Sequence, residues 1–453
     1  MAEETAGLRV DDAEQRKQVR RAVIASTVGT SIEWYDFFLY GTVAALAFPK
    51  LFFPSASAYA GTLESFATFF VGFAARPVGA WIFGHFGDRI GRKSTLIVTL
   101  LLMGIATFLI GVMPTYSTLG VWAAVLLIVL RICQGIGVGG EWGGSVLMSM
   151  EWHRGNRRGF IASWPQAGVP IGLALSIGAV RISSELTGDN FTTSGWRYPF
   201  LFSALLILVG LFIRLRVLET PLFAKVLEMK EVAKAPVPEV LRHHWREIGL
   251  SALARMAEQA PFYIFTTYVL TYGTAELGFQ RNFLLNAVLL AAIVSLFSTP
   301  FFGYLSDIVG RRRMYLIGTV ALLAFAFPYI GLLNSKTSAL VVVAIVASIL
   351  VHDMMYGPQA AFIAESFPTR LRYSGASLGY QLASVVAGGP APLLAAWLLH
   401  TFNSGYAIAG YMALTGVISS VAAAMLGSRN LAASAAAEQE MRQQTAPAPA
   451  VEA

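Results

Sequence analysis

The sequence predicts an all-α membrane protein of twelve transmembrane helices arranged as two bundles of six. Hydrophobic residues make up 56% of the 453 residues and charged residues only 13%, about half the charged share of an ordinary soluble domain. Apolar runs of about 20 residues, the length that crosses a bilayer, recur along the chain. A soluble domain could not cover so much apolar surface with so few charges, so a bilayer is the solvent that fits.

The twelve candidate spans divide into two sets of six. A polar linker, residues 219–246, separates a first bundle at 22–218 from a second at 247–427. We expect a polar N-terminal tail at 1–21 and a C-terminal tail at 428–453 that is disordered, because it is rich in Ala, Glu, Gln and Pro. The expected spans are 22–48, 60–83, 94–113, 118–148, 160–183, 197–217, 247–274, 284–305, 314–334, 338–364, 373–399 and 405–427.

Lysine and arginine are distributed unevenly about these spans. Of the 33, all but eight lie in the tails and in the loops on the side of the N-terminus. Because basic residues favour the cytoplasmic side of a membrane, we expect both termini in the cytoplasm. The same distribution accounts for the net charge of +7 without a nucleic-acid partner. The eight exceptions are Lys50, Arg181, Arg197, Arg281 and Lys336 in outer loops and Arg76, Arg131 and Arg255 within spans.

A short loop motif occurs once in each half. Residues 84–93 read GHFGDRIGRK and residues 303–312 read GYLSDIVGRR, so two glycines, an aspartate and an arginine recur at the same spacing. A second repeat, a glutamate seven residues before an arginine, comprises Glu151, Arg158, Glu365 and Arg372. Internal repeats build many secondary transporters, with the substrate site between the halves near the middle of the membrane.

The loop GxxxDxxGRK/R, doubled in a chain of twelve spans, resembles the major facilitator superfamily over all twelve spans. Further segments are similar to its metabolite:proton symporter family: EWYDFFLYG (33–41), ARPVGAWIFGHFGDRIGRK (75–93), RICQGIGVGGEWGG (131–144), RLRVLETPLF (214–223) and ESFPTRLRYSGASLGYQLAS (365–384). That family includes bacterial carriers for proline and betaine, 2-oxoglutarate, citrate, shikimate and aromatic acids. The resemblance implies a symporter in the bacterial inner membrane that imports a small polar metabolite with protons by alternating access.

The resemblance also implies a gating latch on the cytoplasmic side. In the superfamily, the loop motif and the acid–arginine pairs stabilise the outward-facing state. The alternative is a tight loop with anchoring charges. The latch residues would be Gly84, Asp88, Gly91, Arg92, Glu151, Arg158, Gly303, Asp307, Gly310, Arg311, Glu365 and Arg372.

Ionisable residues inside the spans are candidates for proton coupling, because a charge at the bilayer centre costs at least about 2.5 kcal/mol. Asp36 lies near the middle of the first span, and Glu33 is three residues earlier on the same face. Span four carries Arg131 and Glu141, and RICQGIG resembles the RxxQGxG motif whose arginine the superfamily links to proton transfer. We expect these four residues to couple protons to transport. The alternative is a structural ion pair of Arg131 with one of the acids.

Other polar residues in the spans are candidates for substrate binding. Arg76 and Arg255 suit the carboxylate of an organic acid, with a zwitterion such as proline or betaine as the alternative substrate. Arg255 could instead pair with Glu258 three residues later, and Arg76 could extend to the membrane surface. The remaining candidates are Gln166, Tyr268, His352, Asp353, Tyr356 and Gln359.

The sequence carries no zinc-protease HExxH motif and no ATP-binding GxxxxGK[ST] loop. We therefore expect no enzyme, cofactor or metal, and a monomer whose partners are a small-molecule substrate, protons and the lipid bilayer. An exporter or proton antiporter of the same fold stays open, although residues 166–178 match the exporter pattern GxxxGPxxGG only in part. A membrane sensor or channel is a further alternative, which the doubled latch motif and short tails disfavour.

The Lys and Arg distribution gives a direct test of topology. A reporter domain that is active only in the cytoplasm is fused at residue 1 or after Ser428. Both fusions are expected to be active, because the basic loops keep both termini on the cytoplasmic side. An external signal from either fusion would overturn the predicted topology.

Overall fold

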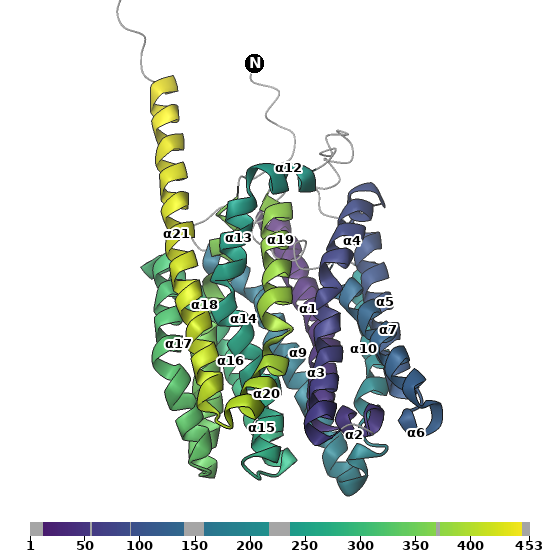
Figure 1. Cartoon of the computed structure of the whole chain (residues 1–453). Helices are drawn as coiled ribbons and strands as arrows, with labels where there is room; N and C mark the ends of the chain where they lie inside the picture. Colours follow the sequence, from purple (N-terminus) through teal and green to yellow (C-terminus); the bar gives the residue numbers. More distant parts are fainter. Residues whose placement is uncertain are drawn as a thin grey trace, which may run out of the picture.

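The computed structural model describes the backbone of residues 12–54, 57–90, 92–139, 158–216, 236–367 and 372–445. Within these ranges, eight helices are both long and apolar enough to cross a membrane, and two shorter apolar helices lie at 97–112 and 197–213. The helix at 12–46 and the helical stretch at 245–275 complete twelve spans. The predicted two bundles of six are confirmed, and Figure 1 shows them side by side.

The N-terminal bundle holds six spans, joined in part by the short helices α2 (Phe48–Phe52) and α6 (Tyr116–Leu119). Its second span is broken in two at Ala75, and its fifth is extended by a 3-10 turn, η1 (Gly188–Thr192). The spans are α1 (Asp12–Leu46), α3 (Ala58–Ala74) with α4 (Arg76–Ile90), α5 (Arg92–Val112), α7 (Val121–Gly139), α9 (Arg158–Thr187) and α10 (Arg197–Arg216).

The C-terminal bundle follows α12 (Pro236–His243), and two of its spans contain a π-helical turn. The seventh span is α13 (Trp245–Ala254), α14 (Met256–Tyr263), η2 (Ile264–Tyr268) and α15 (Val269–Ala275). The eighth to tenth are α16 (Arg281–Val309), α17 (Arg311–Asn334) and α18 (Ser338–Ala364). The last two are α19 (Arg372–Ala383), η4 (Ser384–Gly388) and α20 (Ala391–Phe402), and then α21 (Tyr406–Thr445).

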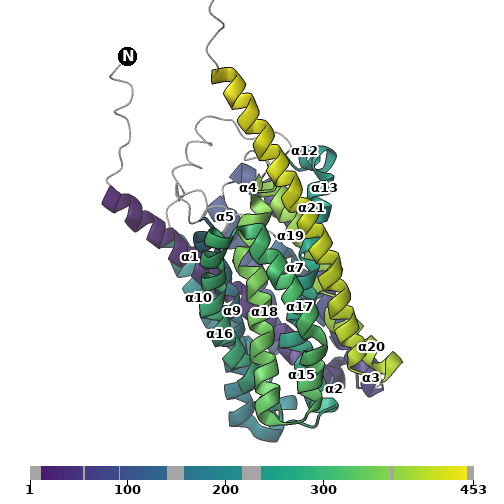
Figure 2. The ribbon, with the colours of Figure 1, turned by 90° about the vertical axis from the view of Figure 1, so that its left-hand side faces the viewer.

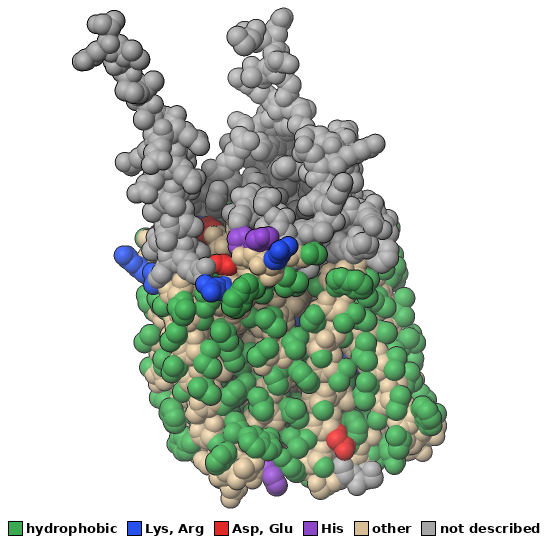
Figure 3. Space-filling view, turned by 45° about the horizontal axis from the view of Figure 1, so that its top comes forward, with side chains coloured by type: hydrophobic (Ala, Val, Ile, Leu, Met, Phe, Trp, Pro, Cys, Tyr) green, Lys and Arg blue, Asp and Glu red, His purple; other side chains and the backbone are tan. Residues whose placement is uncertain are grey.

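The start of α1, the end of α21 and α12 lie at one end of the molecule, which we call the terminal end (Figures 1 and 2). The helices α2, α6 and α15 lie at the opposite, distal end (Figure 1). Hydrophobic side chains cover most of the flank seen in Figure 3, and the Lys and Arg side chains in view sit mainly at the terminal end. Exposed large apolar residues such as Trp81 and Phe297 are therefore placed to face lipid.

The helix boundaries differ from prediction at both ends of the chain. Residues 428–445, which were expected to be disordered, continue α21 as helix, and α1 begins at Asp12, inside the predicted tail. The linker at 219–246 contains α12 and the start of α13. Ala, Glu and Gln are good helix formers, and extending an existing helix needs no new nucleation. Composition alone therefore mistook a helical extension for disorder.

The π-turns lie where the C-terminal bundle meets the N-terminal one. The turn η2 packs against α1, and η4 packs against α3. Pro261 precedes η2 by three residues and Pro390 follows η4 by two, so each irregular turn has a nearby proline to account for it. A π-turn displaces the side chains beside it and is frequent at functional sites. Both turns thus mark the centre of the interface.

Glycines bring α7 into close contact with both halves of the second span, α3 and α4. A Cβ on Gly135 would lie 2.1 Å from the Gly72 carbonyl oxygen, and one on Gly139 would lie 2.0 Å from that of Arg76. Close backbone approach through small residues is how membrane helices pack. Gly72 also leaves room for Arg131, whose Nε would lie 2.4 Å from a Cβ added there. This packing brings two buried arginines into the same layer of the bundle.

Gly135→Ala is expected to lower the stability of the purified protein by about 1–3 kcal/mol, because the new methyl group meets backbone that cannot rotate away. Gly178→Ala in α9 is the matched control, since a Cβ there has no neighbour within 4 Å. Thermal unfolding in detergent measures the difference. Equal melting temperatures for the two variants would contradict the close crossing of α3 and α7.

Candidate functional site

Aromatic rings from both bundles fill the centre of the interface. The ring of Tyr263, at the end of α14, lies 6.2 Å from Phe37, 5.7 Å from Phe69 and 5.2 Å from Phe73 between centroids. All four side chains are buried. Polar groups within this layer are therefore separated from both lipid and water.

Arg76 lies inside this aromatic layer. Its side chain is 0% exposed, and its guanidinium carbon is 4.3 Å from the ring centroids of both Phe37 and Phe73. Tyr263 is a polar neighbour, yet none of its three guanidinium nitrogens makes a hydrogen bond of normal geometry with any described residue. The possibility that Arg76 extends to the membrane surface is thus wrong. A buried cation in this state lacks an anionic partner.

Arg131 is also fully buried, but it is partly satisfied. Its Nη1 donates to Gln134 Oε1 at 3.1 Å and its Nη2 contacts the Phe69 carbonyl at 3.5 Å. Its guanidinium carbon lies 4.2 Å from the centroid of Tyr40. No ion pair joins it to a carboxylate among the described side chains, so the alternative of a structural pair with Asp36 or Glu33 is not formed. Glu141 lies outside the described residues.

Asp36 is buried in α1, with 2% of its side chain exposed. Its Oδ1 has no hydrogen-bond partner among the described residues, and its polar neighbour is the Thr107 hydroxyl. Thr107 accepts in turn from Gln134 Nε2 at 2.8 Å, and Gln134 accepts from Arg131. Asp36 and Arg131 are therefore connected through two intermediate side chains. Glu33 is buried on the same helix.

The second predicted arginine, Arg255, has partners within its own bundle. Its Nη2 donates to Glu258 Oε2 at 3.1 Å, and its Nη1 donates to the Tyr380 carbonyl at 2.8 Å. Glu258 Oε2 also accepts from Gln359 Nε2 at 2.8 Å. The alternative of a local pair between Arg255 and Glu258 is thus confirmed. Of the two remaining buried arginines, Arg131 has an amide and a carbonyl partner, whereas Arg76 has no hydrogen-bond acceptor among the described residues.

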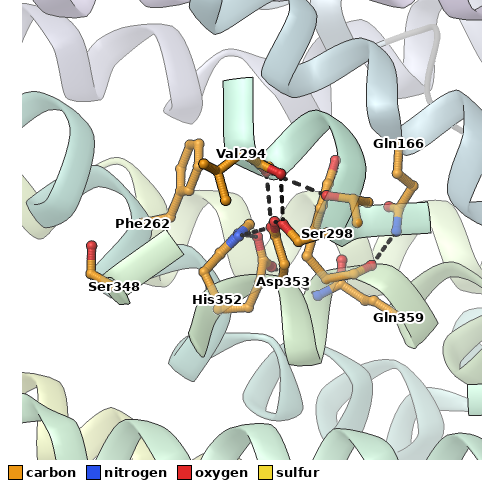
Figure 4. A network of polar contacts seen from close by, with 12 residues as sticks. Gln166, Phe262, Val294, Ser298, Ser348, His352, Asp353 and Gln359 are labelled. Carbon is orange, nitrogen blue, oxygen red and sulfur yellow. Dashed lines mark hydrogen bonds and ion pairs between the residues drawn. The ribbon is translucent and has the colours of Figure 1, made fainter. Parts of the chain in front are cut away.

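His352 and Asp353 belong to the same network (Figure 4). His352 Nδ1 lies 2.8 Å from Asp353 Oδ1, and its Nε2 lies 3.3 Å from Glu258 Oε1. Ser295 donates to Asp353 at 3.1 Å, and Ser298 of the same helix α16 also contacts that carboxylate. Sequence reasoning found His352 and Asp353 from their depth, but it missed the central place of Glu258 and both serines.

Three other residues predicted to bind substrate lie beside this network. Gln166 of α9 donates from Nε2 to the Tyr356 carbonyl of α18 and so joins the two bundles. The Oε1 atoms of Gln166 and Gln359 are buried without a partner among the described residues. Tyr268 is not part of the group, because its ring packs near Phe66 and Tyr272.

At the terminal end, a carboxylate at a helix N-terminus joins the two bundles. Asp307, at the end of α16, accepts from the backbone N–H groups of Gly159 and Phe160 at 2.8 and 2.9 Å. This is the favoured place for a negative charge, because the first amides of a helix have no internal partner. Arg311 bridges Asp307 and Glu365, at 3.1 Å from each. These contacts bind α16 of one bundle to α9 of the other.

Two predicted latch glycines shape this junction. A Cβ on Gly303 would lie 2.6 Å from Ser163 of α9, and Gly310 ends α16 with a φ of +98°, a conformation that favours glycine. The remaining latch side chains lie outside those described: Gly84, Asp88, Gly91, Arg92, Glu151, Arg158 and Arg372.

The bundles also touch at the distal end. Arg281 Nε donates to Ser184 Oγ at 2.8 Å, which joins α16 to α9 a second time. The rings of Tyr59 and His400 stack at 3.7 Å between α3 and α20. The two bundles therefore touch at both ends of the molecule, with the buried central layer between these contacts.

Comparison with known proteins settles the family. The model of the Major Facilitator Superfamily matches residues 27–392. The chain belongs to the major facilitator superfamily. It is similar to the shikimate transporter of Escherichia coli K12, with 42% identity over 90% of this chain and 94% of the relative. An inner membrane metabolite transport protein of the same organism is 41% identical, over 87% and 90%.

A proline/betaine transporter of Salmonella typhimurium is 33% identical, over 88% of this chain and 82% of the relative. Among solved structures, a D-xylose-proton symporter superposes with a TM-score of 0.71 at 18% identity, over 90% of this chain and 97% of that one. This member of the major facilitator superfamily is therefore a multi-pass membrane transporter and not an enzyme.

Asp307→Asn is expected to weaken the capped junction by about 1 kcal/mol, or about fivefold in the equilibrium between closed and open terminal ends. Because the change lies away from the central layer, substrate affinity should be kept while the rate of net uptake falls. Glu64→Gln, at an exposed carboxylate of α3, is the control. Unchanged uptake by Asp307→Asn at equal expression would contradict a gating role.

Proposed function

We propose that this transporter is a proton-coupled symporter that imports a small organic acid across the bacterial inner membrane by alternating access. The observation that carries the proposal is the guanidinium of Arg76, which is buried between the bundles and has no anionic partner among the described residues. A substrate carboxylate would supply that partner, since a guanidinium binds a carboxylate through two parallel hydrogen bonds.

The surrounding polar atoms fit the rest of such a substrate. The carbonyl oxygens of Gln166, Gln359 and Gln259 are buried and have no donor among the described residues. Hydroxyl groups on an organic acid could donate to them. Aromatic rings would hold the apolar part of the molecule. We expect His352, Asp353 and Tyr356 to form the wall behind these glutamines.

An organic acid fits better than a zwitterion for an electrostatic reason. The cation of proline or betaine would need a carboxylate or the open face of an aromatic ring. The rings of Phe37 and Phe73 already lie against Arg76, and Glu258 is paired with Arg255. The relatives named for shikimate and for proline and betaine all carry substrates with a carboxylate. Their names support an arginine ligand but leave the choice between acid and zwitterion to experiment.

Asp36 is the proposed carrier of the coupled proton. A buried carboxylate with an oxygen lacking a donor is costly as an anion, so the closed form favours the protonated acid. Opening to the cytoplasm would admit water and let the proton leave. The connection through Thr107 and Gln134 to Arg131 offers a route by which protonation of Asp36 affects the arginine layer. An inward proton gradient would then drive import, with both termini and the terminal end in the cytoplasm.

Asp36→Asn is expected to abolish uphill accumulation while keeping substrate exchange, because asparagine resembles the protonated acid and cannot release a proton. The assay uses right-side-out vesicles with an imposed pH gradient and labelled shikimate, proline or betaine. Accumulation is compared with counterflow at equal concentrations. Asp36→Glu should restore part of the accumulation with a shifted pH profile.

Three results would count against this proposal. Normal accumulation by Asp36→Asn would place coupling on another group. Accumulation that follows a sodium gradient and ignores the pH gradient would remove the proton. Efflux driven by the inward proton gradient would favour the antiporter alternative.

A further inference from the structure

The imidazole of His352 lies between two carboxylates in the C-terminal bundle. Its Nδ1 is 2.8 Å from Asp353 Oδ1 and its Nε2 is 3.3 Å from Glu258 Oε1. All three side chains are almost completely buried, with at most 3% exposed. Both ring nitrogens therefore face carboxylate oxygens, and neither is exposed to water.

Glu258 is surrounded by donors. Its Oε2 accepts from Arg255 at 3.1 Å and from Gln359 at 2.8 Å, and its Oε1 accepts from Gln259 Nε2 at 3.2 Å as well as facing His352. An ionised carboxylate is acceptor-only and has about four lone-pair sites. These contacts fit the ionised form of Glu258, and they require His352 Nε2 to carry its hydrogen.

A neutral imidazole has only one N–H group. If Nε2 carries it, then Nδ1 presents a lone pair to the Asp353 oxygen at 2.8 Å, which is repulsive unless a further proton lies between them. That proton lies either on Nδ1, as an imidazolium beside a carboxylate, or on Asp353, as a carboxylic acid beside a neutral ring. In both arrangements the pair holds one proton more than neutral histidine and aspartate anion together.

The charge balance of the cluster requires the same proton. Arg255 and Glu258 cancel, which leaves Asp353 as an uncompensated buried anion when His352 is neutral. One added proton makes the group neutral, and burial strongly disfavours a net charge.

The remaining neighbours of the cluster do not change its net charge. Tyr356 stacks on His352 at 5.0 Å, and the rings of Phe262 and His352 lie 4.6 Å apart. Tyr263, Tyr315 and Tyr380 are the other titratable groups near Glu258. From α16 the hydroxyls of Ser295 and Ser298 reach Asp353, and Figure 4 shows Ser298 beside it. None of these neighbours carries a positive charge. Arg76, the further cation of this layer, faces Tyr263 and Tyr380 and forms no ion pair with Asp353.

We propose that His352 and Asp353 form a proton-binding site in the C-terminal bundle, occupied in the closed form and separate from Asp36 in the N-terminal bundle. In place of the substrate contact expected from the sequence, the two residues hold a proton between them. The site is a property of the folded protein. Its effect on transport rests on the proposed symport function, because only a carrier that opens the bundle to water would exchange this proton during its cycle.

The test reads the proton directly in purified protein without substrate. At about pH 7.5, where an exposed histidine is mostly neutral, nitrogen NMR of labelled histidine reports an imidazolium, and infrared spectra report a carboxylic acid. We expect one of these two signals in the parent protein. Both His352→Gln and Asp353→Asn should remove it, whereas His244→Gln, in the connection between α12 and α13, should leave it unchanged.

A neutral His352 ring together with ionised Asp353 and Glu258 at that pH would overturn the proposal. The parent spectrum and one folded variant together decide whether the proton is present, because the variant separates the signal of this pair from a carboxylic acid at Asp36. The result therefore stands even if the other variant fails to fold. Transport is not part of this measurement. Transport driven by a sodium gradient would contradict the proposed proton symport and would leave the proposal of this proton-binding site unaffected.

Discussion

The cost of burying charge without a partner governs the centre of this transporter. A lipid-facing protein can hold arginines at mid-depth only if they meet anions, carbonyls or aromatic faces. Arg255 meets Glu258 and a carbonyl, Arg131 meets an amide and a carbonyl, and Arg76 meets only rings and a phenol neighbour. Among the described residues, Arg76 is thus the buried central arginine whose three guanidinium nitrogens all lack an acceptor, which is the physical reason to place a substrate anion there.

The two bundles satisfy their buried charges in different ways. The C-terminal bundle closes its cluster internally, through Arg255, Glu258, His352 and Asp353 with one added proton. The N-terminal bundle keeps a cation and an acid, Arg76 and Asp36, with unused hydrogen-bonding atoms. The C-terminal bundle also keeps two side-chain carbonyl oxygens, on Gln259 and Gln359, without a donor among the described residues. A ligand that binds these oxygens and Arg76 favours the form in which both bundles contact it. The contacts at both ends, led by Asp307 on α9, hold the halves together around that ligand.

Sequence alone could predict the spans, the two halves and the depth of each ionisable residue, because apolar run length and loop motifs are local patterns. It could not say which partner each buried charge has. Arg255 and Glu258 share one helical face and were paired correctly, but the reach of His352 to Glu258 crosses between helices. The sequence also could not predict that Arg76 is buried, because this burial depends on the close approach of α4 and α7 at their glycines. The helical ends of α1 and α21 escaped prediction because composition carries no sign of a helix that simply continues.

The central claim is that Arg76 binds the carboxylate of the substrate, and direct binding to purified protein tests it best. Titration with shikimate and with its uncharged amide compares a carboxylate with a neutral isostere. The account predicts that the parent and the exposed control Arg313→Gln prefer the acid by about tenfold or more, as charge-assisted hydrogen bonds imply. Arg76→Gln should lose that preference. If Arg76→Gln bound the acid with the affinity of the parent, the anion would sit elsewhere and the account would be contradicted.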